Sequence, residues 1–187
     1  LPPEVAAVSQ DPARRVDHYI LVEHLGTGGM GVVHKAWDLK LSRAVALKFL
    51  KNIGDDAGKS YFEREARLAA GLSHPNIAAI YEVGRREQGP FMAMQYVPGQ
   101  RLEQLPRKNL KKLVGLIRDA ARAVGFANLK GVIHRDLKPS NLMVTPEGHL
   151  YVMDFGVARP VEGPGHQTVS GSSGSVVGTP EYMAPEQ

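Results

Sequence analysis

Apolar runs of strand length dominate the first half of the chain. Residues 32–37 are β-branched and aromatic, and residues 44–50 and 91–97 form longer apolar runs, so each segment predicts a strand. Glycine-rich residues 26–31 precede the first of these runs. Strand, glycine turn and strand together predict a hairpin.

One helical pattern interrupts these strands. Residues 61–72 place Phe62, Ala66 and Ala69 on one face of a helix. Glu65 lies on the same side, because it comes three positions after Phe62 and four before Ala69.

The second half of the chain predicts a long helix and then a strand, a turn and a strand. Apolar residues recur at spacings of three and four up to Gly131, a residue type that commonly ends helices. The recurring positions are Leu110, Leu113, Val114, Ile117, Ala120, Ala121 and Val124. Residues 142–144 and 150–153 flank a turn and place Asp154 at the end of a strand.

Composition narrows the class of protein. A length of 187 residues with 43% hydrophobic content is enough for one compact domain with a sizeable core. The net charge is +4, but the basic residues are scattered, so a nucleic-acid partner is not expected. The absence of cysteine excludes disulfides and thiolate chemistry. No apolar run approaches membrane-spanning length, and no signal peptide is visible.

Three polar positions carry the candidate chemistry. Asp136 and Asn141 lie five positions apart in His-Arg-Asp-Leu-Lys-Pro-Ser-Asn, and Asp154 stands before Phe-Gly. An acid, an amide and a second acid in this order are suited to a nucleotide phosphate and its magnesium. A polar surface loop that holds these residues by chance is the alternative, and the order of two spaced motifs disfavours it.

These motifs resemble the eukaryotic-like protein kinase family over about residues 19–187, with details similar to the bacterial serine/threonine kinases. The resemblance implies an α+β, bilobal protein-kinase-like fold with an antiparallel β-rich N-lobe that contains one helix. An incomplete helical C-lobe would follow, because the family's large lobe continues beyond Ala-Pro-Glu. The expected organisation is a loose leader over 1–17, rich in Ala and Pro, an N-lobe over 18–97 and a partial C-lobe over 98–187.

The sequence around the glycine motif distinguishes two interpretations of it. Gly26, Gly28 and Gly31 have a spacing that dinucleotide-binding folds also use. Such a fingerprint should open a helix, whereas a strand follows here, which fits the flap that a kinase folds over ATP. Glycine there would let backbone N–H groups approach the phosphate oxygens. A P-loop NTPase is disfavoured, because the sequence lacks its G-x-x-x-x-G-K-[ST] motif.

The resemblance assigns roles to the matching residues. Asp136 would be the catalytic base, with Asn141 and Asp154 as magnesium ligands. Lys48 lies inside an apolar strand and therefore needs an anionic partner. In the family that partner is ATP phosphate together with a glutamate, here Glu65, so we expect a Lys48–Glu65 ion pair in the active form.

Two further residues would act on the substrate side. Lys138 would neutralise charge on the transferred phosphoryl group, and the Thr179 hydroxyl would bond Asp136 and Lys138. Both residues resemble the serine/threonine branch of the family.

A nucleotide pocket is also implied by family position. Backbone groups would meet the adenine edge, apolar side chains would lie above and below the ring, and Met94 would limit access to the back. The pocket residues are Val33, Ala46, Met94, Gln95, Val97 and Met143, beside the three glycines and Lys48. Core packing alone also explains Val33, Ala46 and Met143, and the two interpretations are compatible.

The implied activity is a protein serine/threonine kinase that transfers the γ-phosphoryl group of ATP to Ser or Thr hydroxyls with Mg²⁺. The alternative is a catalytically inactive ATP-binding fragment or pseudokinase-like scaffold. Expected partners are ATP, protein substrates with Ser/Thr acceptors and a second copy for autophosphorylation. A cytoplasmic location is expected, including that of the cytosolic part of a membrane-anchored kinase.

Arg135 next to Asp136 further suggests control by phosphorylation, because this arginine requires an anion. Hydroxyls in the Gly/Ser-rich segment near the C-terminus could carry the phosphate, with Ser173 favoured over Ser175.

Overall fold

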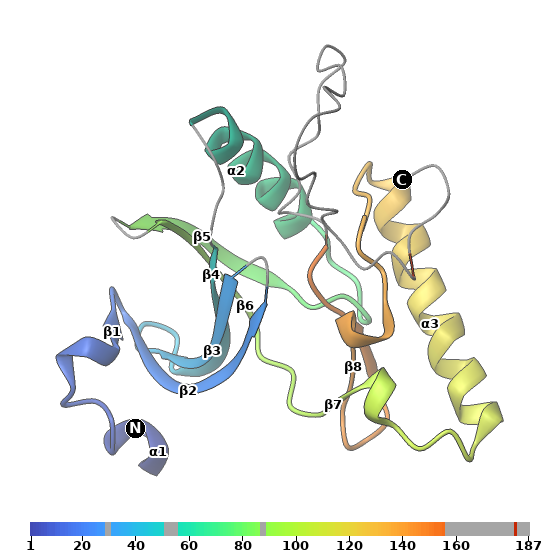
Figure 1. The fold of residues 1–187 in the computed structure, drawn as a ribbon, viewed down its shortest axis with the longest axis horizontal. Helices are drawn as coiled ribbons and strands as arrows, with labels where there is room; N and C mark the ends of the chain where they lie inside the picture. Colours follow the sequence, from blue (N-terminus) through green and yellow to red (C-terminus); the bar gives the residue numbers. More distant parts are fainter. Residues whose placement is uncertain (29–30, 51–55, 87–88, 156–181, 183–187) are drawn as a thin grey trace, which may run out of the picture.

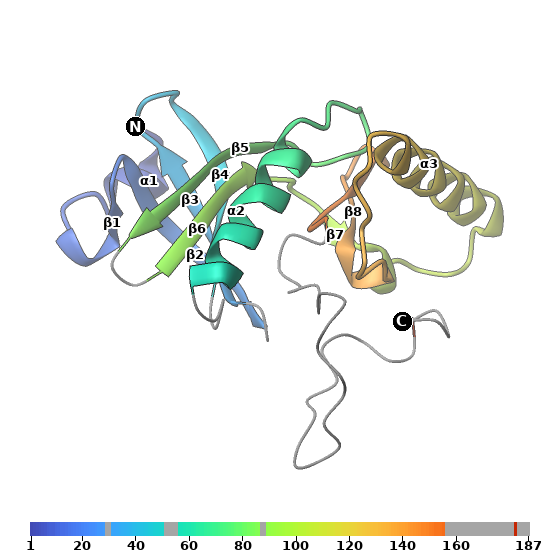
Figure 2. The same ribbon diagram turned by 90° about the horizontal axis from the view of Figure 1, so that it is seen from above.

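A computed structural model describes residues 1–28, 31–50, 56–86, 89–155 and 182. A six-stranded antiparallel sheet forms one side of the molecule, and helix α3 lies on the other (Figure 1). A three-stranded sheet lies between them (Figure 2). The α+β, two-lobed fold implied by the sequence is therefore confirmed.

The six-stranded sheet has the order β1-β2-β3-β4-β6-β5. Its strands are β1 (Arg15–Val16), β2 (Tyr19–Gly28), β3 (Gly31–Asp38), β4 (Arg43–Leu50), β5 (Ile80–Arg86) and β6 (Gly89–Gln95). All three predicted strands and the predicted hairpin are present, since Gly28 pairs with Gly31 across the β2–β3 turn.

Helix α2 (Asp56–Ala70) covers one face of this sheet. The predicted face is correct, because Phe62, Ala66 and Ala69 are all buried. They join a core that continues through Met92 and Met94 of β6 to α3. A separate core on the opposite face of the sheet contains Val16, Tyr19, Ala36, Val45, Leu47, Phe91 and Ala93.

The second half contains the three-stranded sheet and the long helix. The sheet has the order β7-β8-β9, formed by β7 (Gln100–Arg101), β8 (Leu142–Val144) and β9 (Leu150–Val152). Helix α3 (Leu110–Leu129) begins after Asn109, whose side chain accepts the Lys112 N–H at 2.9 Å. The predicted stop at Gly131 is confirmed by its positive φ of 76°. Short turns η2 (Leu102–Gln104) and η3 (Pro139–Asn141) complete this half.

The N-terminal segment differs from the prediction of a loose leader. Helix α1 (Pro3–Ala6) buries Val5 to 1% exposure, and β1 pairs with β2 after the short turn η1 (Pro12–Arg14). The Arg14 guanidinium donates to the Val22 carbonyl at 3.1 Å, where the β2–β3 register shifts. These contacts anchor residues 1–17 on the sheet, so the prediction requires correction.

Candidate functional site

The predicted site residues gather where the six-stranded and three-stranded sheets meet. Lys48 on β4 supplies the link from the first sheet. It is only 7% exposed, and its Nζ donates to Asp154 Oδ1 at 2.8 Å. Because a buried ammonium requires an anionic partner, this bond fixes the position of both groups.

Asp154 follows β9, as the sequence predicted. Burial raises the pKa of its carboxyl, but the charge and hydrogen bond of Lys48, aided by the charge of Lys138, bring the pKa below its usual value. The carboxylate is therefore ionised at neutral pH. Its backbone φ of 52° lies in the left-handed region, an uncommon conformation for an aspartate that is often found at functional sites.

His134 ties the loop that carries Asp136 to the end of β9. Its Nε2 lies 2.8 Å from the Met153 carbonyl oxygen and must carry the proton, while its Nδ1 accepts the Asp136 N–H at 3.3 Å. Burial lowers the pKa of His134, which keeps the ring neutral in the tautomer that these two bonds require. Its ring also packs on Phe155, with centroids 4.8 Å apart.

The role of His134 is not apparent from the sequence. A histidine directly after the apolar pair Val132-Ile133 was a weak signal for a buried, positioning side chain.

Asp136 is the centre of a small polar network. The Asn141 amide donates to the Asp136 carbonyl at 2.8 Å and to its Oδ2 at 3.1 Å. Lys138 Nζ lies 3.0 Å from the same Oδ2. The Met153 N–H donates to the Asn141 carbonyl at 2.9 Å, next to Asp154. The structure thus brings Asp136, Lys138, Asn141 and Asp154 together.

Glu65 has a different partner from the one predicted for the active form. Arg135 Nη1 lies 3.2 Å from Glu65 Oε2, while Lys48 is paired with Asp154. No Lys48–Glu65 pair occurs among the residues that the structure describes. Two ion pairs therefore lie in this part of the site. Lys48 pairs with Asp154, and Arg135 pairs with Glu65. The predicted Lys48–Glu65 pair concerns the active form, so it stays a prediction.

The structure explains why one position of the β2–β3 hairpin requires glycine. Gly31 has a φ of 148°, and a Cβ there would overlap the Phe49 carbonyl oxygen of β4. Close strand packing thus requires this glycine, independently of any ligand. At Gly28 a Cβ would meet nothing within 4 Å, and at Gly26 it would meet only the Arg101 guanidinium at 4.0 Å.

The predicted pocket residues line adjacent strands. Ala46 of β4 pairs with Met94 of β6, and Val33 of β3 pairs with Lys48. Gln95 donates its N–H to the Ala79 carbonyl at 2.8 Å, so an adenine would have to use the Gln95 carbonyl. Val97 is buried after β6, and Met143 lies on β8 of the opposite sheet.

Met94 also lines an apolar recess that reaches the end of β9. The lining residues are Ala69, Ile77, Ala78, Ile80, Met92, Met94, Asp154 and Phe155. Thr179 and the predicted phosphorylation sites lie outside the described residues.

Comparison with known proteins identifies the class. Residues 19–187 match the protein kinase domain family, and the chain belongs to this family. It is 39% identical over 186 residues to the serine/threonine-protein kinase PknB of Mycobacterium tuberculosis, which covers 94% of this chain and 29% of PknB. It is also 39% identical over 174 residues to the serine/threonine-protein kinase pkn3 of Myxococcus xanthus, which covers 87% of this chain and 32% of pkn3.

Solved structures agree. The crystal structure of the Mycobacterium tuberculosis PknI kinase domain matches with a TM-score of 0.68 at 27% identity, over 78% of this chain and 62% of that one. The chain thus spans about a third or less of the length of its curated relatives. No helix in the described part of the chain is long and apolar enough to cross a membrane.

Proposed function

We propose that this chain carries the nucleotide site and catalytic loop of a protein serine/threonine kinase. The observation that supports this most strongly is a continuous set of contacts from β4 to the catalytic loop. Lys48 binds Asp154, the residue before Asp154 binds Asn141, and Asn141 binds Asp136. Residues more than a hundred positions apart thus form one polar cluster, as phosphoryl transfer requires.

ATP would bind between the two sheets. The adenine would lie between Val33 and Ala46 on one side and Met143 on the other, with its edge at the Gln95 and Val97 backbone. Lys48 would hold the α- and β-phosphates beneath the glycine hairpin. Because Val33 pairs with Lys48 in the sheet, one strand register would position both the ring and the phosphates.

The oxygen donors present fit magnesium. Magnesium prefers one or two carboxylate or amide oxygens and completes its coordination with phosphates and water. Asp154 is ionised, and Asn141 uses its amide NH₂ on Asp136, which leaves its Oδ1 for a metal. Among the described residues no group of three or more His, Cys, Asp or Glu side chains could hold a metal ion, so phosphate oxygens would have to complete the shell. Bound magnesium would neutralise charge on the phosphates.

The acceptor hydroxyl would be a Ser or Thr of a protein. Its oxygen would attack the γ-phosphorus, the bond to the β–γ bridging oxygen would break, and its proton would pass to the Asp136 carboxylate. Lys138, 3.0 Å from that carboxylate, would offset the negative charge of the transferred group. We include Thr179 in this role on family position alone.

Glu65 and Arg135 suggest how activity is controlled. A phosphate on Ser173 or Ser175 would compete with Glu65 for Arg135. Release of Glu65 would allow it to pair with Lys48, as expected for the active form. Autophosphorylation by a second copy and a cytoplasmic location, including that of a cytosolic domain of an anchored protein, belong to the same proposal.

Labelled ATP tests the proposed activity. The variants are Asp136→Asn and, as a matched control, Asp119→Asn on α3, where Asp119 is half-buried and pairs with Arg118 outside the site. Each is made in this chain and in the full reading frame that contains it. Loss of the base should reduce phosphorylation of a Ser/Thr substrate by about 10²–10⁴-fold, and the control should leave it unchanged. Activity that survives Asp136→Asn contradicts the assignment of the base. Magnesium-dependent ATP binding without transfer by any form would instead support the inactive scaffold.

A further inference from the structure

Arg101 lies beside the proposed nucleotide site and has no role in the chemistry described above. It pairs with Met143 across β7 and β8. Directly opposite residues in a sheet extend their side chains from the same face. Arg101 therefore extends from the sheet face on which Met143 would contact the adenine.

From that face the Arg101 side chain extends towards Gly26 of the β2–β3 hairpin. Its Nη2 lies 4.0 Å from the point where a Cβ on Gly26 would be. Gly26 pairs with Val33, and Val33 pairs with Lys48, so Gly26, the hairpin residue nearest to the Arg101 guanidinium, lies two strand spacings, about 10 Å, from Lys48. Arg101 thus stands at the outer edge of the cleft, while Lys48 lies inside it.

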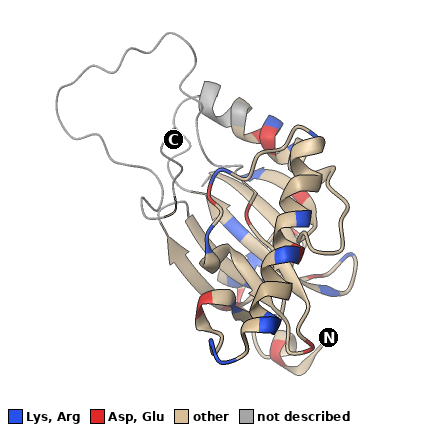
Figure 3. Ribbon diagram, turned by 90° about the vertical axis from the view of Figure 1, so that its right-hand side faces the viewer, with Lys and Arg blue, Asp and Glu red and all other residues tan. Residues whose placement is uncertain are grey.

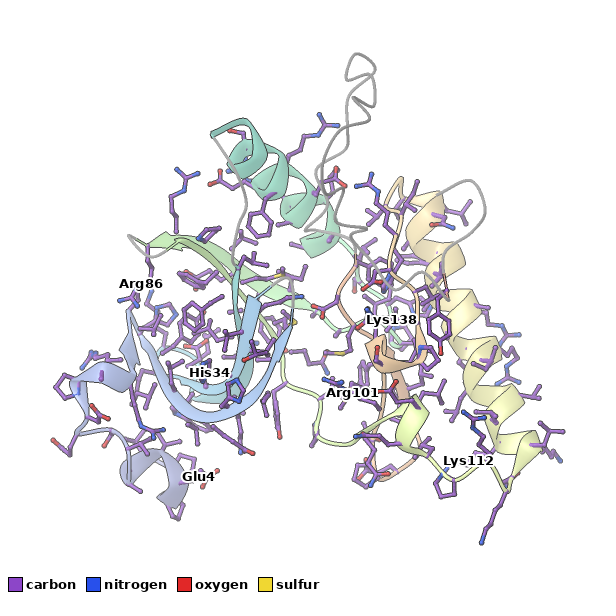
Figure 4. The ribbon with its side chains drawn as sticks, in the orientation of Figure 1. Glu4, His34, Arg86, Arg101, Lys112 and Lys138 are labelled. Atoms are coloured by element: carbon purple, nitrogen blue, oxygen red, sulfur yellow. The ribbon has the colours of Figure 1, made fainter. Side chains whose placement is uncertain are left out.

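The same segment borders the catalytic loop. Strand β7 and turn η2 both contact η3, which begins directly after Lys138. In Figure 4 the labelled Arg101 and Lys138 both lie between the β2–β3 hairpin and the three-stranded sheet. A peptide that presents a hydroxyl to Asp136 from this edge would pass Arg101.

Among Lys48, Arg101, Arg135 and Lys138, Arg101 can exchange its carboxylate partner for another anion most easily. Lys48, Lys138 and Arg135 each hold a carboxylate at 2.8 to 3.2 Å. Arg101 lies 3.8 Å from Glu103, and its side chain is 50% exposed. Such an exposed, long ion pair contributes little, so exchanging it for a substrate carboxylate costs little.

We propose that Arg101 determines substrate specificity by binding an acidic side chain of the protein substrate close to the phosphorylated Ser or Thr. An arginine fork suits a carboxylate, with which it forms two parallel hydrogen bonds. The ribose hydroxyls, the other groups expected nearby, are neutral and do not require a full positive charge. This inference rests on the proposed kinase function.

A peptide set tests it in the full reading frame that contains this chain. Each peptide has one Ser acceptor in a neutral background, with a single Asp, Ala or Lys moved through the positions on either side. We expect kcat/KM for the best Asp peptide to exceed that for its Ala counterpart by about fivefold. Arg101→Gln should bring this ratio close to one, and Arg101→Glu should transfer the preference to Lys. The matched control Arg118→Gln, on exposed α3, should keep the wild-type ratio.

Two results overturn the inference while the kinase function stands. One is an Asp preference that Arg101→Gln leaves intact. The other is a higher KM for ATP in Arg101→Gln with an unchanged Asp preference, which assigns the residue to the nucleotide instead. If wild-type protein phosphorylates none of the peptides, the proposed function fails and the inference fails with it.

Discussion

Helices α2 and α3 are both amphipathic, but they differ in how much of their apolar surface is covered. In α2 the predicted apolar face is the buried one, formed by Phe62, Ala66 and Ala69. In α3 the buried positions are Leu116, Ala120, Ala123 and Ala127, and Leu113 and Val124 pack against the same core while partly exposed. Leu110 and Val114 remain 70% and 60% exposed.

The two helices flank the site on different sides, so the difference in their covered apolar surface is a difference between those sides. Helix α2 packs its apolar face on the sheet and places Glu65 3.2 Å from Arg135 of the catalytic loop, whereas the outer face of α3 is exposed. Ile133 and Leu137, on either side of Asp136, are exposed as well. Lys and Arg positions are spread along this side of the molecule rather than gathered (Figure 3). We therefore expect substitutions in α2 to affect stability more than those on the outer face of α3.

The largest effect should come from the core face of α2. Phe62→Ala removes a buried aromatic side chain and should lower the free energy of unfolding by about 3–5 kcal/mol. Urea unfolding followed by circular dichroism measures it. A loss below about 1 kcal/mol would mean that α2 is not packed as described.

The Glu65–Arg135 pair gives a smaller effect. Both side chains are mostly buried, so Glu65→Gln should cost about 1–2 kcal/mol, between the values for exposed and buried pairs. Glu63→Gln is the control on the same helix, because Glu63 pairs with exposed Arg67 and Arg85. Equal losses in the two variants would show that the pair with Arg135 contributes nothing particular.

Low pH should lower the stability of the folded chain through His134. Its pKa is lowered by burial, so the unfolded chain binds a proton more readily than the folded one. Stability should therefore fall as the pH drops below about 6.5, by up to about 1.4 kcal/mol for each pH unit. Thermal unfolding at several pH values measures this slope, and His134→Gln should reduce it. An unchanged slope would indicate that other groups carry it.

The smallest effect is expected on the outer face of α3. Val114→Ser should change the free energy of unfolding of this chain by no more than about 0.5 kcal/mol, because the side chain is exposed. A loss comparable with that of Phe62→Ala would mean that this face is covered in solution.

The sequence predicted local structure well and long-range partners poorly. The hairpin, α2 and its face, and the position of Asp154 after β9 follow from periodicity and glycine placement. The Arg135 partner that Glu65 has in this structure could not be predicted, because several charged side chains from distant segments meet at the same place and their spacing in the sequence does not rank them. The packing of Val5 and the β1–β2 pairing depend on complementary surfaces that the composition of 1–17 does not reveal. The buried stripe of α3 was missed for the same reason, since apolar residues occur on more than one of its faces.

The most direct test is whether Lys48, Asn141 and Asp154 hold one magnesium-bound triphosphate. Calorimetry with ATP, with and without Mg²⁺, measures this in the wild type, in Asn141→Ala and Asp154→Asn, and in the control Asp119→Asn. We predict that magnesium strengthens ATP binding in the wild type and the control. In each site variant the increase in ATP affinity that magnesium causes should be at least about tenfold smaller. An equal gain from magnesium in all four proteins would contradict the site.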